Sequence, residues 1–435
     1  MASGQTTSKA TGYTIMQLSK IIIAPDSFKG NLTANRAADI IAAEVGKELH
    51  GCNIVTMPIA DGGEGSVNAI LSAIGGELFA VRVRSPDDRR IEAAYGIAYN
   101  ATAIIEMAQS SGITRQIGLH PMTSTTFGFG QLVLAALKRG ARDFILCIGG
   151  SATTDGGCGM AAALGVRFTD RHGESFVPCG GTLCDIIEID TDELDPRIAK
   201  SRFTVMCDVD NPLYGLNGAA HVYAPQKGAD PEQVLVLDRG LRHYGSLLEE
   251  KFGGLPEEQC GSLPEEQCGS HPEEKFGKEQ FGKEQFAKEQ LDKEQPGKEP
   301  SNRAQFAEIP GAGAAGGLGA GCMAFLGANL MSGIDTILKL CQFEKHKVDA
   351  GLIITGEGKL DSQSFQGKVL SGLLQRANGI PVWSICGICD CDVAVLKKHD
   401  LKVFEMSEGI TVEESMREPE KYLRAAARRA MESVK

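Results

Sequence analysis

The fold is decided by a segment near the amino terminus that reads Lys20-Ile-Ile-Ile-Ala-Pro-Asp-Ser-Phe-Lys-Gly30. Its uninterrupted apolar run is typical of a strand that is buried on both faces. The loop that follows is rich in the Pro, Asp, Ser and Gly residues that turns require. Thr33 then fits the N-cap of a helix that ends near Leu49. The segment therefore predicts a buried strand, a polar loop and a helix.

The same pattern recurs along the chain. Strand-like apolar runs occupy Lys20–Ala24, Asn53–Pro58, Asp143–Ile148, Arg202–Cys207, Gly351–Thr355, Pro381–Cys386 and Lys402–Glu405. Helical spacing of apolar residues is found near Gln131–Lys138, Glu232–Glu249, Ile334–Leu340 and Glu418–Ser433. Strands that alternate with helices predict an α/β fold whose sheet is mainly parallel and covered by helices on both faces.

Composition narrows the class of protein. The chain has 435 residues, and 44 basic against 56 acidic side chains give a net charge of -12, which argues against nucleic acid as a partner. No apolar run approaches the length of a membrane span, and the start of the chain lacks a secretory signal pattern, so no membrane association is expected. Thirteen cysteines without framework spacing favour free thiols and a cytoplasmic protein. A weak transit-peptide pattern leaves an organelle open as an alternative.

One tract stands apart from the rest of the chain. Residues 253–300 repeat an eight-residue unit and then a five-residue unit, and they hold 12 acids and 6 lysines. Neither period fits a helix or a strand, and the apolar residues are too few to offset the entropy of ordering. We predict a disordered low-complexity insertion, with a charged helix or an interaction tract as the alternative.

Four loops of similar composition follow apolar runs. They are Ala24–Gly30, Ala60–Ser66, Gly149–Gly157 and Thr355–Asp361, all dense in Gly, Asp, Ser and Thr. Ligands of α/β proteins bind beyond the carboxyl ends of strands, where helix N-termini present free N–H groups. Gly149–Gly157 is the best candidate for a phosphate cradle, because glycine permits close approach of the backbone and a helix begins near Cys158. The alternative is that each loop is an ordinary turn.

Other glycine- and cysteine-rich motifs are less informative. The Gly311–Gly321 stretch fits either a nucleotide-binding backbone or a tightly packed helix of small residues. The only match to a Walker A pattern begins at Gly277 inside the repeats and lacks the Ser or Thr that binds magnesium, and no Rossmann fingerprint is present. The cysteines of Cys386–Cys391 have no second ligand pair, so we interpret them as thiols at a strand end.

Six segments together resemble the bacterial-type glycerate kinase family, specifically its two-domain glycerate 2-kinases. They are IIIAPDSFKGNLTA from Ile21, ADGGEGSV from Ala60, GGSATTDGGCGMAAALG from Gly149, CDVDNPLYGLNGAAHVYAPQKGAD from Cys207, IPGAGAAGGLGAG from Ile309 and ITGEGKLDSQSFQGKV from Ile354. The segments lie in the family's order and span nearly all of the chain after about Lys20. The departures from the family pattern are the N-terminal extension and the repeats, which lie between motifs.

The resemblance implies two α/β domains with the site in the cleft between them. A Rossmann-like or flavodoxin-like parallel domain, residues 20–62 and 306–435, would be built from both ends of the chain, so that the Lys20 strand pairs with the late strands. Residues 63–305 would form an inserted second α/β domain that carries the repeats, and residues 1–19 a flexible extension. The implied activity is ATP-dependent phosphorylation of D-glycerate, more often at the 2-hydroxyl than at the 3-hydroxyl.

The chemistry of phosphoryl transfer suggests roles for the residues in these loops. The catalytic candidates are Asp26, Lys29, Asp155 and Asp208, with Asp26 or Asp155 accepting the proton of the glycerate hydroxyl. Asp208 and Asp210 are the candidate ligands of Mg²⁺. Candidates for binding phosphate or substrate are Ser27, Asp61, Glu64, Gly150, Ser151, Thr153, Lys227, Gly313, Gly316, Glu357 and Asp361. For any one of these residues, a helix cap or a solvated side chain is the alternative.

Two other functions remain open from the sequence alone. A kinase for another small hydroxy acid is the nearest one, because sequence does not show pocket size. A scaffold that has lost catalysis and acts through its acidic repeats is the other, although the loop acids are retained. Oligomeric state is also open, with a homodimer among the arrangements considered.

Overall fold

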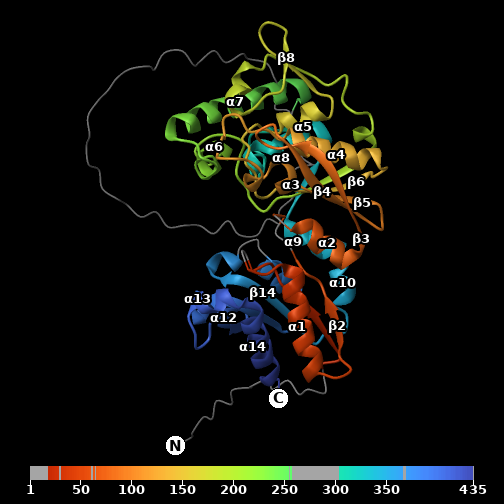
Figure 1. Cartoon of the computed structure of the whole chain (residues 1–435), viewed down its shortest axis with the longest axis vertical. Helices are drawn as coiled ribbons and strands as arrows, with labels where there is room; N and C mark the ends of the chain where they lie inside the picture. The colour runs from red at the N-terminus through yellow and green to blue at the C-terminus, as the bar shows by residue number, and fades with distance from the viewer. Residues whose placement is uncertain are drawn as a thin grey trace, which may run out of the picture.

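The computed structural model describes residues 18–28, 31–59, 62–63, 65–253, 255–256, 303–365 and 369–434. The extension predicted for residues 1–19 and the insertion predicted for residues 253–300 lie almost wholly outside these ranges. Two large sheets dominate the described part, one in the lower and one in the upper half of the view in Figure 1. The α/β fold class is confirmed.

The first sheet is fully parallel and has the order β16-β15-β14-β1-β2. Its strands are β1 (Lys20–Ile23), β2 (Asn53–Thr56), β14 (Leu352–Leu360), β15 (Val382–Cys389) and β16 (Lys402–Glu405). The pairing of β1 with β14 and of β14 with β15 confirms that the amino-terminal strand joins the late strands.

Helices cover both faces of this sheet, as predicted. Ile21 and Ile23 pack with α1 (Ala34–Glu48) and α14 (Pro419–Glu432), whereas Ile22 faces a second core that includes α11 (Val369–Arg376). Thr33 caps α1 by accepting a 3.2 Å hydrogen bond from the Arg36 N–H. The alternation of adjacent isoleucines between two cores explains why the run is apolar without a break.

The second sheet is mixed and has the order β13-β10-β6-β5-β4-β3. Its strands are β3 (Gly76–Arg84), β4 (Arg90–Ala98), β5 (Thr102–Glu106), β6 (Asp143–Cys147), β10 (Arg202–Met206) and β13 (Asn329–Met331). The first four strands of this order are parallel, whereas β3 and β4 extend the sheet in antiparallel fashion. Sequence analysis missed β3 and β4. β3 is the largely solvated edge strand and carries charged residues instead of a continuous apolar run, whereas β4 beside it is mostly buried or half-buried.

The division into two domains stays a prediction, and strand pairing bears on its boundary. β13 pairs with β10 in the six-stranded sheet, although it lies after residue 306, where the predicted discontinuous domain resumes. The helix before it, α8 (Ala314–Leu326), also packs in the cores of that half. One core cluster runs between the two halves and includes Ile70 of α2 (Ser66–Ile74) and Ile337 of α9 (Gly333–Leu340).

The predicted helices are all present. The Gln131 and Glu232 segments lie in α4 (Phe127–Lys138) and α7 (Pro231–Phe252), and the Ile334 segment lies in α9. The remaining elements are α3 (Ala108–Ser111), η2 (Ile113–Arg115), α5 (Cys158–Ala163), β7 (Arg167–Thr169), β8 (Ser175–Phe176), η3 (Gly180–Asp185), β9 (Glu188–Asp190), η4 (Ile198–Lys200), α6 (Ala219–Tyr223), η5 (Pro225–Lys227), β11 (Leu255–Pro256), β12 (Arg303–Ala304), α10 (Phe343–His346), η7 (Ser362–Phe365), α12 (Val393–Lys398) and α13 (Val412–Arg417). Among the described residues, no helix combines the length and the apolarity that crossing a bilayer requires.

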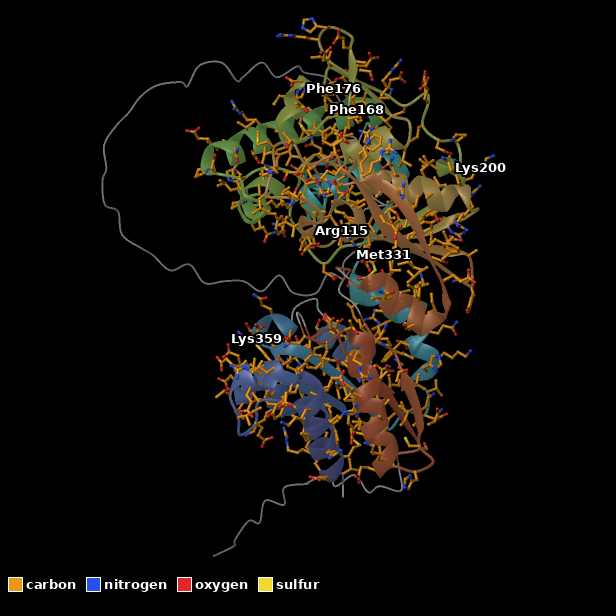
Figure 2. All side chains as sticks on the ribbon, viewed as in Figure 1. Arg115, Phe168, Phe176, Lys200, Met331 and Lys359 are labelled. Atoms are coloured by element: carbon orange, nitrogen blue, oxygen red, sulfur yellow. The ribbon has the colours of Figure 1, made fainter. Side chains whose placement is uncertain are left out.

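Phe168 and Phe176 belong to a small antiparallel sheet, β8-β7-β9. Figure 2 places these two residues at the end of the molecule far from Lys359, whereas Arg115 and Met331 lie on the side of the upper half that faces it. The small sheet is therefore remote from the region where the two halves meet.

Candidate active site

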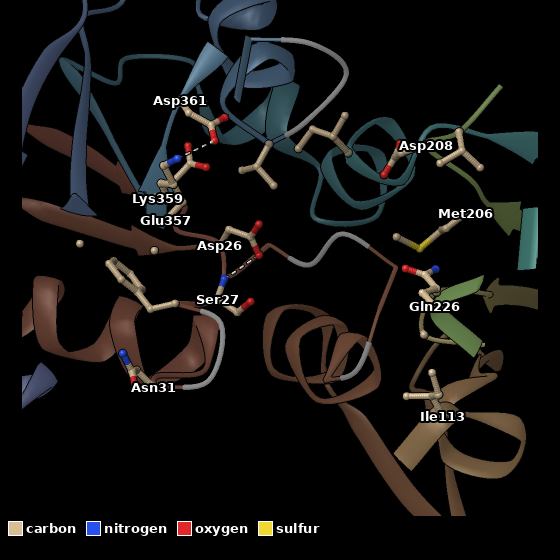
Figure 3. A pocket seen from close by; sticks show the side chains of 18 of the residues that line it. Asp26, Ser27, Asn31, Ile113, Met206, Asp208, Gln226, Glu357, Lys359 and Asp361 are labelled. Carbon is tan, nitrogen blue, oxygen red and sulfur yellow. Dashed lines mark hydrogen bonds and ion pairs between the residues drawn. The ribbon is translucent and has the colours of Figure 1, made fainter. Parts of the chain in front are cut away.

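A cavity of about 880 Å³ lies between the two sheets. Its lining comes from the carboxyl ends of β1, β14, β15 and β16 on one side and of β6 and β10 on the other. Figure 3 shows the two sides facing each other, with Asp26 and Glu357 on one and Asp208 and Gln226 on the other. Parallel strands thus direct their carboxyl-end loops to a common site, as ligand sites in α/β proteins require.

The five-stranded side is rich in acids. In this sheet β2 lies on one side of β1, and β14, β15 and β16 lie on the other side. The direction in which successive strands are added therefore reverses between β1 and β14. At this switch point the Asp26 N–H donates to the Gly356 carbonyl at 2.8 Å, and the Asp26 carboxylate accepts the Ser27 N–H at 2.6 Å. Glu357 accepts a 2.8 Å hydrogen bond from the Ser364 hydroxyl. Two predicted acids thus share one sheet edge.

Lys359 and Asp361 lie at the same edge. The Lys359 ammonium is 3.0 Å from the Asp390 carboxylate and 3.6 Å from that of Asp361, and Figure 3 shows the second contact. Asp361 also accepts the Gln363 N–H at 3.0 Å. The charge of this lysine is therefore balanced by acids that follow β14 and the neighbouring β15.

The glycine-rich loop after β6 is fixed by backbone contacts. Gly149 donates to the Gly62 carbonyl at 3.1 Å, and Gly150 accepts the Ile113 N–H at 3.0 Å. Gly150 and Ser151 line the cavity, and Gly150 has a φ of +76°, which favours glycine. The loop is therefore held on both flanks before any ligand binds.

Lys227 is a buried cation at the wall of the cavity. Its side chain is 1% exposed, and its ammonium donates to the Ser151 hydroxyl at 2.8 Å and to the Thr153 carbonyl at 2.6 Å. Burial lowers the pKa of Lys227 from 10.5 to about 7, and the nearby Asp155 carboxylate opposes that shift. Close to neutral pH, Lys227 can therefore carry or lose its charge according to what binds beside it.

Asp155 does not line the cavity. Its buried carboxylate accepts the Thr126 N–H at 2.7 Å, the Thr126 hydroxyl at 2.8 Å and the N–H groups of Gly157 and Gly159, both at 3.2 Å. Burial raises the pKa of Asp155, although these hydrogen bonds oppose the change. The carboxylate thus orders the first turns of α4 and α5 instead of facing a ligand.

The two aspartates after β10 differ in position. Asp208 lines the cavity and accepts the Gly333 N–H, the first of α9, at 2.8 Å. Asp210 is exposed and is not part of the lining. The structure therefore does not bring this candidate pair of metal ligands together at the cavity.

The carboxylates fit Mg²⁺ only as a partly solvated ion. Within the described ranges, no three His, Cys, Asp or Glu side chains are close enough to form a metal cage. Mg²⁺ usually takes one or two carboxylates together with substrate phosphates and water, and Asp208 or Asp26 can supply such ligands. The cysteines that the structure describes are free thiols, as predicted; Cys386 is buried within β15, and the half-buried Cys389 ends that strand.

Six other candidates are not among the described residues that line the cavity. Lys29, Asp61 and Glu64 lie outside the described residues. Thr153, Gly313 and Gly316 are not in the lining either.

Gly316 lies where a Cβ would be 2.0 Å from the Thr153 carbonyl oxygen, with a φ of +73°. The stretch Gly311–Gly321 is closely packed, but it is not one regular helix, because Ala315, Gly316 and Gly317 have positive φ. Since Ala314 and Ala315 also line the cavity, both interpretations of this stretch stay open.

Sequence analysis missed several lining residues. Asn31, Tyr223 and Gln226 are polar, and Met406 and Met416 belong to an apolar wall. Gln226 directly precedes Lys227 and could have been included with it. No sequence pattern distinguishes the residues of this wall, because apolar residues after β16 have the composition expected of the hydrophobic core.

Comparisons with known proteins agree with this geometry. The model of the glycerate kinase family matches residues 21–263 and 275–435. A glycerate kinase of Halalkalibacterium halodurans is 37% identical over 418 residues, which cover 94% of this chain and 97% of the relative. The glycerate 2-kinase of Escherichia coli is 36% identical over 405 residues, which cover 92% and 93%.

Among solved structures, one from Salmonella typhimurium LT2, described as a glycerate kinase 2, matches with a TM-score of 0.74 and 32% identity. The match covers 95% of this chain and 97% of that one. Because family model, relatives and fold agree over nearly the whole length, the chain belongs to the glycerate kinase family of enzymes.

Proposed function

We propose that this enzyme transfers the γ-phosphoryl group of ATP to the 2-hydroxyl of D-glycerate. The observation that carries the proposal is the buried Lys227 ammonium in the same cavity as the carboxylates of Asp26, Glu357 and Asp208. Phosphoryl transfer depends on positioning and on neutralising charge, and these groups provide both signs. The name of the Escherichia coli relative supports the 2-hydroxyl as acceptor.

Lys227 is our candidate for binding the carboxylate of glycerate. An anion beside the ammonium favours its charged form, so binding raises the lowered pKa of this lysine again. The Ser151 hydroxyl, 2.8 Å from the ammonium, offers a second donor. An ammonium and a hydroxyl at one wall suit a small hydroxy acid.

Asp26 is our candidate for the base that accepts the hydroxyl proton. It lines the cavity at the switch point of the five-stranded sheet, whereas Asp155 is fully buried. Asp208 is our candidate for a magnesium ligand, and bound Mg²⁺ would neutralise the charge that develops on the phosphates. The free thiols support the cytoplasm as the place of action.

The experiment that tests the proposal is ³¹P NMR of the product made from ATP, Mg²⁺ and D-glycerate. We expect the resonance of 2-phosphoglycerate and no ATP consumption without D-glycerate. L-Glycerate, glycolate, D-lactate and tartronate serve as matched acceptors. A 3-phosphoglycerate resonance would contradict the assigned position, and faster turnover of another acid would contradict the substrate.

A further inference from the structure

An apolar wall lies at the five-stranded end of the cavity. Met406 follows β16, Val412 and Met416 lie on α13, and Ile388 lies near the end of β15. Phe28, from the loop after β1, is 2% exposed and completes the lining there. Met416 is 53% exposed although it is apolar, so part of the wall is open to the cavity.

Two glycines form the part of the lining beside this wall. Gly358 and Gly387 lie opposite each other on β14 and β15, between the paired residues Glu357–Cys386 and Lys359–Ile388. A Cβ on Gly387 would be 2.4 Å from the Gly358 carbonyl oxygen, so the strands approach too closely for a side chain. Because neither residue has a side chain, the lining between Glu357 and Ile388 includes exposed backbone atoms of this glycine pair.

We propose that this apolar wall and the two glycines bind the nucleobase of the nucleoside triphosphate, an inference that rests on the proposed kinase function. A nucleobase is a flat ring with apolar faces and polar edges. Its faces would contact Met416 and Ile388, and backbone groups of the glycine pair would meet its edge. The triphosphate would then extend past Asp26 towards the centre of the cavity.

The opposite orientation suits the charges less well. Met206, Ile113 and Ile148 are also apolar, but they lie at the end of the cavity that contains Lys227 and Asp208. The Lys227 ammonium already donates to the Ser151 hydroxyl and the Thr153 carbonyl, but both acceptors are neutral. An anion beside the ammonium would offset the remaining cost of burying its charge, whereas a neutral base supplies no charge. The acceptor carboxylate therefore belongs at that end and the base at the other.

Methionine methyl groups report the position of the base directly. Met406 and Met416 lie at the proposed end, and Met206 at the other, so one ¹³C-methyl-methionine sample contains both the probes and their control. Peaks are assigned by Met→Ala variants. On addition of ATP and Mg²⁺ without D-glycerate, we expect ring-current shifts of the Met406 and Met416 methyl groups that inorganic triphosphate does not cause.

Shifts confined to Met206, equal shifts at both ends, or no difference between ATP and triphosphate would each overturn the inference. Independently, Met416→Ala should weaken ATP binding about 3- to 10-fold, measured by calorimetry, because apolar area at the base is lost. Its KM for D-glycerate should stay unchanged. Val393→Ala is the matched control, since Val393 is 62% exposed on α12 and does not line the cavity.

The two proposals fail in different ways. An enzyme that phosphorylates D-glycerate but shows no shift at Met406 and Met416 would refute the base site and leave the function intact. A protein that shows those shifts but does not phosphorylate D-glycerate would refute the function alone. Unchanged ATP affinity of Met416→Ala would count against the base site.

Discussion

Across the cavity, the edge of the five-stranded sheet presents half-buried acids, whereas the edge of the six-stranded sheet presents a fully buried lysine in a glycine-rich frame. Asp26 and Glu357 keep contact with the cavity and have Ser27 and Ser364 as partners. Lys227, in contrast, is surrounded by protein. The first edge can adapt its charges to phosphates and metal, while the second has its cation in place before the substrate arrives.

This difference has a thermodynamic side. Burial disfavours the charged form of Lys227, so a charged lysine at this position lowers the free energy of unfolding. The acids of the other edge remain partly solvated and cost less. Substitutions at the two edges should therefore have different signatures, which the following experiments compare.

The largest effect is expected from Asp26→Asn and Asp208→Asn. Each change removes a charge at the cavity, and we expect kcat to fall about 10²-fold or more, on the scale of a lost catalytic group. Asp210→Asn is the matched control, because Asp210 is exposed like Asp208 but lies outside the lining. Steady-state kinetics with varied Mg²⁺ measure the effect. If all three variants had equal activity, the acids at the cavity would have no special role.

Lys227→Met should act on substrate binding. Loss of a hydrogen bond to a charged group should raise KM for D-glycerate about 10- to 100-fold. In the wild type, kcat/KM for D-glycerate should fall as pH rises through about 7, where the free lysine loses its proton. This dependence of kcat/KM on pH should be absent from Lys227→Met. A wild-type profile that is flat from pH 6 to 8 would contradict the role of this ammonium.

The stability of the same pair of proteins provides a second measurement. Between about pH 7 and 10.5 the unfolded chain holds a proton on Lys227 that the folded chain lacks, so this group makes the free energy of unfolding rise with pH in that window. Below pH 7 the folded state bears the cost of the buried charge. Lys227→Met should therefore have the higher unfolding free energy at pH 6 in urea titrations, unlike the two aspartate variants.

Gly316→Ala tests the rigid frame of the six-stranded edge. The new Cβ would be 2.0 Å from the Thr153 carbonyl oxygen, and the residue has a φ of +73°. We expect a loss of about 3 kcal/mol or more in unfolding free energy. Gly327→Ala is the control, because its φ is +60° but nothing lies within 4 Å of the new Cβ, and it should cost about 1 kcal/mol. Equal losses would mean that α8 can move away from the loop.

The smallest effect is expected from the segment that connects β11 to β12. β11 and β12 pair in antiparallel fashion, with Leu255 opposite Ala304, so the ends of the segment between them are adjacent. Replacing residues 257–302 with a short Gly/Ser turn should leave kcat and KM within about twofold. Loop closure changes stability by only about 0.6 kcal/mol per doubling of length. Loss of activity or solubility would show that the segment contributes to the enzyme.

The sequence predicted the parallel half of the fold well. Runs such as Ile21–Ala24 are apolar without interruption because both faces of the strand are buried. This pattern can be recognised in the sequence without knowing which strands pair with it. The antiparallel edge was missed, since β3 faces solvent over much of its length. β3 is a strand because it pairs with β4, and the apolar residues of β4 show no clear alternation in the sequence.

The candidate site was predicted in part, for a similar reason. Asp26, Ser151 and Lys227 lie in loops whose composition is unusual, and all three line the cavity. Asp155 has the same local signal but is turned towards the starts of α4 and α5. The local sequence shows that a loop contains a carboxylate. Only the packing of the folded chain decides whether that carboxylate faces a ligand or a helix terminus.

The chain crosses between the two large sheets twice, once from β2 to α2 and once from β13 to α9. The two helices that receive these crossings pack together, since Ile70 and Ile337 share one core cluster. Because two chain connections and this shared core cluster join the halves, we expect any motion of one half relative to the other to be a rotation about these connections. The cavity lies between the two halves, so such a hinge rotation would change its width.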